Sequence, residues 1–327
     1  MILDVVDGGL LTTVQDGGRP EWTHLGVPES GAADPWSLAV ANLLLGNAPI
    51  DAALEITIGG PTLVARDSGM VALAGADLGG RVAGGRRLPP GRSHRLAAGE
   101  TVAFEGGRSA GARAYVAVPG GVDVPVVLGS RSTCLAAAFG GFAGRGLRAG
   151  DTIRSRAGGA ADELPELAWP EADDADTRSA EAAVVLRVVP GPDPGLARLV
   201  DGSWHVAPAA DRVGVRLDGS PLRSDIAGET LTHGVAWGTI QVPRDGVPIV
   251  LGPDHQTTGG YRVVGVVIAA DRPALGQLLP GDGLRFAPTS LDAADAALRE
   301  QRAALDSGAR ALRDAAGWER LAASAGG

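Results

Sequence analysis

Short apolar runs separated by glycine and proline make up much of the chain after residue 50. Four of these runs are Leu54–Ile58, Val71–Ala74, Ala114–Val118 and Val124–Leu128, and glycine or proline follows each one. Runs of this length, with turn residues between them, predict short β-strands joined by tight turns, as in a meander or a barrel.

A weak internal repeat supports this β-rich interpretation. The pattern Leu-x-x-Gly-acid-x-apolar occurs at residues 96–102, 147–153 and 278–284. Each copy predicts a turn that leads into a strand. Because the second and third copies end similar stretches of sequence, we infer two related β-modules.

Helical periodicity is confined to two places. After Asp34, a good N-cap, and Pro35, apolar residues share one face until Gly46, which predicts a short helix. After Pro288 the sequence becomes rich in Ala, Leu and Arg. There the residues that share one helical face are Leu291, Ala294, Leu298 and Leu305. We expect this C-terminal helix to have a structural role.

An acidic segment separates the two modules. Residues 161–183 hold eight acidic residues against the single base Arg178, together with two prolines, as expected of a solvated linker. The predicted organisation is an N-terminal β-barrel module (1–160), the linker (161–183), a C-terminal β-barrel module (184–288) and a helical tail (289–327). The predicted fold class is therefore mainly β, with few short helices.

Composition narrows the function. The chain has 327 residues, a net charge of −9 and one cysteine, Cys134, so we expect no disulfide framework and neither a nucleic-acid nor a membrane surface. All 29 basic residues are arginine, which excludes a Walker A lysine, a Schiff base and a biotin attachment site on this chain. The acidic N-terminus and the lack of a long apolar run predict neither export nor membrane insertion, and hence a cytoplasmic protein.

Several familiar signals do not fit their usual context. Ser109 lies in a G-x-S-x-G pattern, and residues 144–149 match G-x-G-x-x-A, but each is flanked by predicted strands where the motif needs a helix. We therefore expect a hairpin loop and a turn. The five histidines lack metal-ligand spacing, so we predict no metal site and interpret them as surface or hydrogen-bonding residues.

Three stretches are denser in polar residues than packing requires. They are residues 12–19 leading to 28–34, residues 129–133 and residues 254–261, where hydroxyl, amide and arginine side chains lie next to glycine. Such groups can converge on an anion or a polarised carbonyl, or they can satisfy one another across the mouth of a barrel. The residues alone leave both interpretations open.

These stretches also carry a family resemblance. The segments Gly9–Asp16, Ser30–Pro35, Leu54–Thr62, Leu128–Thr133 and Gln256–Tyr261 resemble the allophanate hydrolase subunit 2 family, which also contains the C subunit of 5-oxoprolinase and is known as the biotin-dependent carboxyltransferase family. The resemblance runs in order from residue 1 to about residue 287. It implies tandem cyclophilin-like β-barrel modules. In two departures, Arg262 stands where many relatives have Pro and Ala33 where many have Met.

The resemblance also implies partners and a reaction. The family works in a heterocomplex with a subunit 1 protein, and in bacterial 5-oxoprolinase a third, hydrolase-like subunit joins to open 5-oxoproline to glutamate with ATP. We expect this activity, with the ATP site shared with the partner subunit. One alternative is a carboxyltransferase or allophanate-hydrolase-type subunit acting on urea-like amides, with biotin carried on another chain. Another is a non-catalytic regulatory protein that antagonises a kinase inhibitor.

The predicted site residues come from the polar stretches. Arg131, Asp254 and Gln256 are the candidate catalytic residues, with Arg131 expected at an anion. The candidate substrate-binding residues are Ser30, Asp34, Ser132, Thr133, Thr257, Thr258 and Tyr261. Asp34 and Asp254 are candidates either for proton handling or for loop structure.

Overall fold

The computed structural model describes residues 1–106, 111–157, 164–170, 183–222 and 231–317. The chain forms two compact units. Unit 1 contains Met1–Gly17, Pro35–Thr177 and Arg302–Gly327, and unit 2 contains Gly18–Asp34 and Arg178–Gln301. The fold is mainly β with few short helices and one long C-terminal helix, as predicted.

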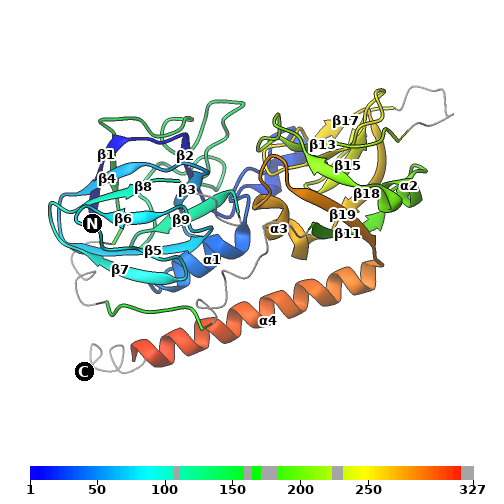
Figure 1. Ribbon diagram of the computed structural model, residues 1–327. Helices are drawn as coiled ribbons and strands as arrows, with labels where there is room; N and C mark the ends of the chain where they lie inside the picture. Colours follow the sequence, from blue (N-terminus) through cyan, green and yellow to red (C-terminus); the bar gives the residue numbers. More distant parts are fainter. Residues whose placement is uncertain (107–110, 158–163, 171–182, 223–230, 318–327) are drawn as a thin grey trace. The chain divides into compact units, whose positions relative to one another are not determined.

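Unit 1 contains two five-stranded antiparallel sheets (Figure 1). The first has the order β10-β1-β4-β8-β6, with strands Thr152–Arg154, Ile2–Asp7, Thr62–Ala65, Thr101–Phe104 and Gly80–Val82. The second has the order β2-β3-β9-β5-β7, with strands Leu11–Gln15, Ala53–Thr57, Arg113–Ala117, Gly69–Gly75 and Arg92–Leu96. One hydrophobic cluster takes side chains from both sheets, among them Leu3, Leu63, Leu54 and Val116, so the sheets share a core.

Helix α1 (Pro35–Leu43) begins directly after Asp34, as the sequence predicted. It packs on β5 and β9, and most of its residues are buried. The core cluster takes Val14, Leu54 and Val116 from the second sheet, and side chains alternate between the faces of a strand. The residues between them, including Thr13, Glu55 and Tyr115, therefore lie on the opposite face of that sheet.

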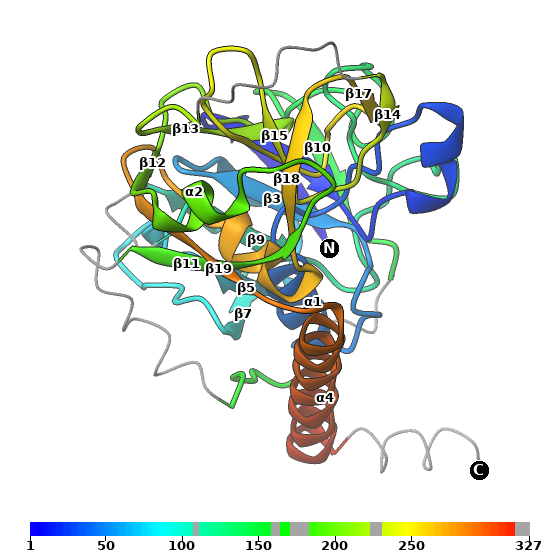
Figure 2. The same cartoon turned by 90° about the vertical axis from the view of Figure 1, so that its right-hand side faces the viewer.

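Unit 2 is built on a closed barrel (Figure 2). Its order is β11-β18-β15-β16-β13-β12-β19, with strands Val184–Pro190, Arg262–Val267, Thr239–Val242, Ile249–Leu251, Gly214–Asp218, Trp204–Val206 and Gly283–Pro288. The parallel pairing of β11 with β19 closes the ring. Leu186, Trp204, Ile240 and Phe286 are buried in its core.

Short elements complete unit 2. They are 3-10 helices η1 (Pro20–Leu25) and η4 (Ala269–Asp271), helices α2 (Leu196–Asp201) and α3 (Arg272–Gly276), and strands β14 (His233–Gly234) and β17 (Thr258–Gly259), which pair with each other. Helix α4 (Leu291–Ala316) contributes residues to both units. Within unit 1, Gly308 of α4 lies against Trp169, where an added Cβ would come within 2.2 Å of the indole.

The sequence repeat corresponds to one turn used three times. In each copy the acidic side chain accepts a hydrogen bond from the backbone N–H three residues earlier, at 3.0 Å in Glu100, 2.8 Å in Asp151 and 2.8 Å in Asp282. The preceding glycine has φ of +86°, +90° and +91° in the three copies. The strand that follows is β8, β10 or β19, so the prediction of a turn leading into a strand is confirmed.

Most predicted elements are present, but one is wrong. Strands β3, β5 and β9 match three of the apolar runs, and residues 144–149 form a turn before β10. Val124–Leu128 is not a strand. Pro125 has no N–H to donate to a ladder, and Leu128 has φ of +53°, which turns the chain into a short Val127–Ser130 bridge.

Two sequence predictions lie outside the described part of the chain. Ser109 belongs to residues 107–110, and the acidic segment 161–183 is described only at residues 164–170 and 183. Within the described ranges, no helix is long and apolar enough to cross a bilayer. Cys134 is fully buried.

Candidate functional site

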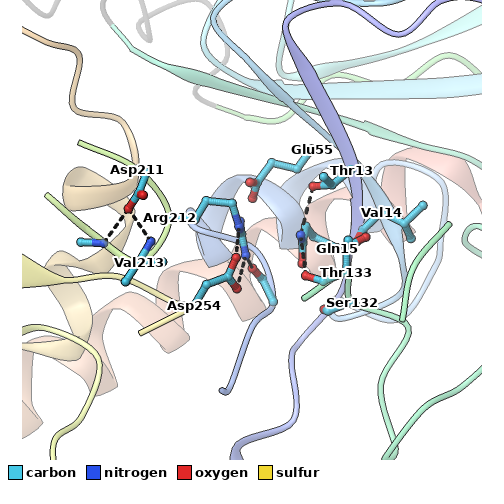
Figure 3. Close-up of polar contacts among 12 residues, drawn as sticks. Thr13, Val14, Gln15, Glu55, Ser132, Thr133, Asp211, Arg212, Val213 and Asp254 are labelled. Atoms are coloured by element: carbon cyan, nitrogen blue, oxygen red, sulfur yellow. Dashed lines mark hydrogen bonds and ion pairs between the residues drawn. The ribbon is translucent and has the colours of Figure 1, made fainter. Parts of the chain in front are cut away.

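The predicted site residues lie in polar networks of both units, and Figure 3 shows Ser132 and Thr133 of unit 1 and Asp254 of unit 2. In unit 1, Arg131, Ser132 and Thr133 lie beside the end of β2. In unit 2, Ser30 and Asp254 are joined through neighbouring backbone groups. The chemistry available to each network follows from its own hydrogen bonds.

Asp16 organises the polar loop of unit 1. Its carboxylate accepts hydrogen bonds from the hydroxyls of Ser130 (2.6 Å) and Ser132, and from the backbone N–H of Arg131 (2.5 Å). The Nε of Arg131 donates to the Val124 carbonyl at 3.0 Å. We call Asp16 and residues 130–133 the Asp16 loop. The Ser130 and Ser132 hydroxyls are bound to a carboxylate, so much of the polarity of the loop holds it in place.

Gln15 and Thr133 tie the same loop to β2. The Thr133 hydroxyl and N–H both donate to the Val14 carbonyl at 2.9 Å, and Gln15 Nε2 donates to the Thr133 carbonyl at 3.2 Å and to Thr13 Oγ1 at 3.0 Å (Figure 3). Gln15 Oε1 is buried without a hydrogen-bond partner among the described residues. A buried acceptor of this kind is rare in proteins and is available to a ligand N–H.

A buried carboxylate lies on the same face of the second sheet. Glu55 is 1% exposed and accepts a hydrogen bond from Tyr115 Oη at 2.7 Å, and Arg113 Nε lies 3.7 Å from its Oε1. Strand register places Thr13 opposite Glu55 and Glu55 opposite Tyr115. This row crosses three strands, and the sequence analysis did not single it out.

In unit 2 a buried ion pair joins two loops. Arg212 donates from Nε to Asp254 Oδ2 at 2.8 Å and from Nη2 to Asp254 Oδ1 at 3.1 Å, while Nη2 also reaches the Gly31 carbonyl at 2.7 Å (Figure 3). Arg212 and Asp254 are 4% exposed. The geometry makes Asp254 an anchor for the 28–34 and 252–258 loops; its proposed part in catalysis stays a prediction.

Ser30 is held in an unusual backbone conformation. Its φ is +55°, in the left-handed region that non-glycine residues seldom adopt, and its N–H donates to the Pro253 carbonyl at 2.9 Å. Its hydroxyl is buried without a hydrogen-bond partner among the described residues. Strain of this kind costs about 1–3 kcal/mol and often marks a functional position.

His255 lies beside this anchor. The side chain is 1% exposed, and its Nδ1 is 2.5 Å from the Gln256 carbonyl. Because a carbonyl only accepts, Nδ1 carries the proton and Nε2 of the neutral ring is an acceptor. Burial lowers the pKa of His255 below its ordinary value, which favours the neutral ring. Its Nε2 is buried and has no partner among the described residues.

Arg272, at the start of α3, stacks on an aromatic ring. Its guanidinium carbon lies 4.5 Å from the centre of the Trp237 ring, and Nη2 donates to the Trp237 carbonyl at 3.2 Å. Among the described residues of unit 2, no carboxylate forms an ion pair with it, and its Nε is buried without a partner. Burial lowers the pKa of Arg272, and the charge of Glu29 opposes that shift.

The remaining residues of the 254–261 stretch lie near the surface. Gln256 is exposed, and its Nε2 is 3.4 Å from Oε1 of buried Gln241. Thr258 is exposed in β17, Tyr261 is 48% exposed, and the Thr257 carbonyl accepts a hydrogen bond from Val235 N–H at 3.0 Å. These side chains flank His255 and are accessible to a ligand.

Asp34 belongs to another contact in unit 2. It is 3% exposed, and its Oδ2 accepts a hydrogen bond from Gln277 Nε2 at 2.7 Å. Gly276, the neighbour of Gln277, packs so closely on the Ala33 carbonyl that a Cβ would lie 2.2 Å from it. These contacts fasten the end of the 28–34 loop beside α3.

The sequence analysis missed the residues that make the unit 2 network distinctive: Arg212, Trp237, Gln241, His255 as a buried group, and Arg272. The sequence around Arg212 does not show that this arginine is buried, because the contact that buries it is with Asp254, over forty residues away. The one available hint is that His255 adjoins Asp254 and Gln256. In the described part of the chain, no three His, Cys, Asp or Glu side chains gather as a metal ion would require.

Comparison with known proteins adds to this picture. Residues 25–288 match the family described as carboxyltransferase domain, subdomain A and B. The C subunit of 5-oxoprolinase from Escherichia coli (strain K12) is 35% identical over 316 residues, covering 92% of this chain and 96% of that protein. The urea amidolyase of Lachancea kluyveri is 31% identical, covering 93% of this chain but 18% of that protein.

Solved structures agree with the sequence comparison. The K. lactis urea amidolyase aligns with a TM-score of 0.85 and 28% identity over 94% of this chain, which spans 20% of that protein. The crystal structure of TTHA0988 aligns with a TM-score of 0.77 and 36% identity over 88% of this chain, which spans 56% of it. The relatives therefore include both a separate subunit and a domain of larger proteins.

Proposed function

Because this chain belongs to the carboxyltransferase-domain family (subdomains A and B), we propose that it is the C subunit of an ATP-dependent 5-oxoprolinase. The reaction would open the lactam of 5-oxoproline with water to give glutamate. The chain would act in a complex with a subunit 1 protein and a third, hydrolase-like subunit.

One observation carries the proposal. The match to the E. coli protein covers 92% of this chain and 96% of that protein, so the two correspond along nearly their whole length. In urea amidolyase the corresponding region is about a fifth of the protein. The E. coli subunit is also more similar in sequence to this chain than two urea amidolyases are, at 35% identity against 31% and 28%.

The unit 2 network offers groups that suit a small cyclic amide. A neutral imidazole whose Nε2 has no partner among the described residues can accept an N–H, and Gln241 and Ser30 supply buried amide and hydroxyl groups. Such groups, fixed before the ligand arrives, cost no reorganisation when charge develops on the amide. Gln256, Thr258 and Tyr261 would border the ligand from the surface side.

ATP would supply a phosphoryl group that turns the lactam carbonyl oxygen into a better leaving group. The Asp16 loop by itself does not suit a triphosphate, because the Ser130 and Ser132 hydroxyls and one backbone N–H already bind the Asp16 carboxylate. The Thr133 hydroxyl donates to the Val14 carbonyl. Only the distal guanidinium nitrogens of Arg131 are left for an anion. We therefore propose that partner subunits supply most of the nucleotide contacts.

The test is reconstitution. The chain is co-purified with its subunit 1 and hydrolase-like partners, and phosphate release from ATP is measured with and without 5-oxoproline, alongside glutamate production. We expect phosphate release to rise with 5-oxoproline and to match glutamate. An intact complex that shows no stimulation would refute the proposal. The Arg131→Ala variant is measured in the same assay. If its assembly and turnover are unchanged, Arg131 does not bind an anion in the reaction.

A second candidate is a carboxyltransferase acting on a urea-like amide. It is favoured by the TM-score of 0.85 against urea amidolyase. With no lysine, the chain would need carboxybiotin on another polypeptide. Dependence of turnover on bicarbonate and a biotinylated carrier would identify this activity. Binding of partner proteins without turnover of any amide would instead indicate a regulatory protein.

A further inference from the structure

Unit 2 contains an unusual set of buried polar atoms that lack partners among its described residues. Five of them are Ser30 Oγ, Trp237 Nε1, Gln241 Nε2, His255 Nε2 and Arg272 Nε, and His233 Nε2 is a further such atom outside this group. We call these five residues the His255 cluster. Proteins leave few such atoms unsatisfied, because burying a polar atom without a partner costs its interaction with water. Several in one region indicate that a ligand satisfies them.

Contacts and charges within unit 2 link the members of this cluster, either directly or through residues next to them in the chain. Ser30 N–H binds the carbonyl of Pro253, two residues before His255. Gln256, the neighbour of His255, reaches Gln241 through its side-chain amide at 3.4 Å. Arg272 stacks on Trp237, which lies four residues before Gln241 in the chain. The charges of Glu29 and Arg272 both act on His255.

Arg272 is held in position by the residue before it. Asp271 accepts hydrogen bonds from Arg187 N–H at 2.7 Å and from the Arg187 guanidinium, with Nη2 at 2.6 Å. This bidentate pair fixes the start of α3, and it also uses the carboxylate nearest to Arg272 in the sequence. The contacts of the Arg272 guanidinium are therefore an aromatic face and a carbonyl.

We propose that the His255 cluster is a recognition site for a small cyclic amide that carries a carboxylate, with Arg272 binding the carboxylate and His255 Nε2 accepting the amide N–H. This assignment rests on the proposed function, since 5-oxoproline has both groups on one ring. Ser30 Oγ and Gln241 Nε2 are then donors to the amide carbonyl. Arginine suits the carboxylate because its planar donors match the two oxygens.

Glu29 provides an internal test of charge. Its side chain is half-buried, and its charge acts on both Arg272 and His255 without forming an ion pair with Arg272. A ligand carboxylate bound to Arg272 would be repelled by Glu29. Removing the charge of Glu29 should therefore tighten binding of the acid, whereas removing the charge of Arg272 should weaken it. A purely structural role predicts no such opposition.

The experiment compares 5-oxoproline with 2-pyrrolidinone, which is the same lactam without the carboxylate. Dissociation constants are measured by calorimetry on the full chain and on the reconstituted complex, and KM is taken from turnover. We expect Arg272→Gln to weaken 5-oxoproline binding roughly 10- to 100-fold and to leave 2-pyrrolidinone unchanged. Glu29→Gln should strengthen 5-oxoproline binding alone, and His255→Leu should weaken both ligands.

Controls separate this proposal from the proposed function. Arg216→Gln changes an exposed arginine of β13 and should alter neither ligand. If wild type binds 5-oxoproline, Arg272→Gln weakens that binding, and no turnover is seen, then the 5-oxoprolinase proposal is refuted and the recognition site is supported. If Arg272→Gln is folded and binds both ligands as wild type does, or if wild type binds neither ligand, the recognition site is refuted. Should Arg272→Gln fail to fold, an unchanged affinity in Glu29→Gln refutes it.

Discussion

The ion pairs of this protein differ in the exposed fraction of their side chains and therefore in how much they contribute to stability. The Arg212–Asp254 pair is almost fully buried, whereas the side chains of Arg81 and Glu105, 3.8 Å apart, are 42% and 68% exposed. Removing one partner of a buried pair leaves a charge without compensation, which is costly. Exposed pairs contribute little because water and salt screen them.

We expect Asp254→Asn to lower the free energy of unfolding by about 3–5 kcal/mol, because the buried Arg212 guanidinium would lose the carboxylate that accepts two of its hydrogen bonds. The measurement is denaturant unfolding followed by circular dichroism, with Arg81→Gln as the exposed control expected below about 1 kcal/mol. A loss for Asp254→Asn no greater than that of the control would show that the pair does not anchor the two loops.

His255 makes stability depend on pH. In the folded protein, burial of the ring lowers the pKa of His255 below its ordinary value of about 6.5. In acid the unfolded chain therefore binds a proton at His255 that the folded chain does not bind, and this difference favours unfolding. Wild type should therefore lose stability as the pH falls below about 6.5, by about 1.4 kcal/mol per pH unit until the folded pKa is reached. His255→Gln should lose less over that window. Equal slopes from pH 7 to pH 5 would contradict this.

Among the structural elements, the recurring turn before β8, β10 and β19 shows how a sequence repeat becomes a structural one. The glycine in each copy has a positive φ, and at all three positions no atom lies within 4 Å of an added Cβ. Substitution there changes backbone strain without a steric clash. The acidic residue that follows closes the turn on a backbone N–H.

We expect Gly99→Ala, Gly150→Ala and Gly281→Ala to destabilise the protein by similar amounts, about 1–2 kcal/mol each, since alanine is strained in the left-handed conformation. Thermal and denaturant unfolding would measure the three losses. Gly234→Ala is the matched control, because that site is also open but has no positive φ, and it should be nearly neutral. Widely different losses among the three turns would show that they are not equivalent.

At the scale of the whole protein, the described residues form two hydrophobic clusters. One belongs to the paired sheets of unit 1 and the other to the barrel of unit 2. Chains with more than one such core often depart from two-state unfolding. The same turn occurs in both units, so the same glycine-to-alanine substitution can be made in either unit.

Calorimetry should resolve two transitions for this chain. Gly150→Ala, in unit 1, should lower the midpoint of one of them, and Gly281→Ala, in unit 2, should lower the other. The double variant should show both shifts, because the two sites share no partners. A single transition that both variants shift alike would mean that the units unfold together.

Local sequence patterns were enough to predict the β-rich architecture, the short helix after Asp34 and the long C-terminal helix. Periodicity and turn residues encode these features, because each depends on residues close in the chain. Motifs spread from residue 1 to about residue 287 also indicated the family, and the composition excluded lysine chemistry. The strand predicted at Val124–Leu128 is wrong because Pro125 and the positive φ of Leu128 outweigh the apolar pattern.

Which polar residues act together depends instead on the packing of distant segments. Asp16 meets the hydroxyls of Ser130 and Ser132 more than a hundred positions away, and Arg212 meets Asp254 across two loops. The isolation of Arg272 from any carboxylate contact in the described part of unit 2 is likewise a property of the packed barrel. Burial and pairing arise from long-range contacts, so a buried, charged arginine and a surface arginine look the same in the sequence.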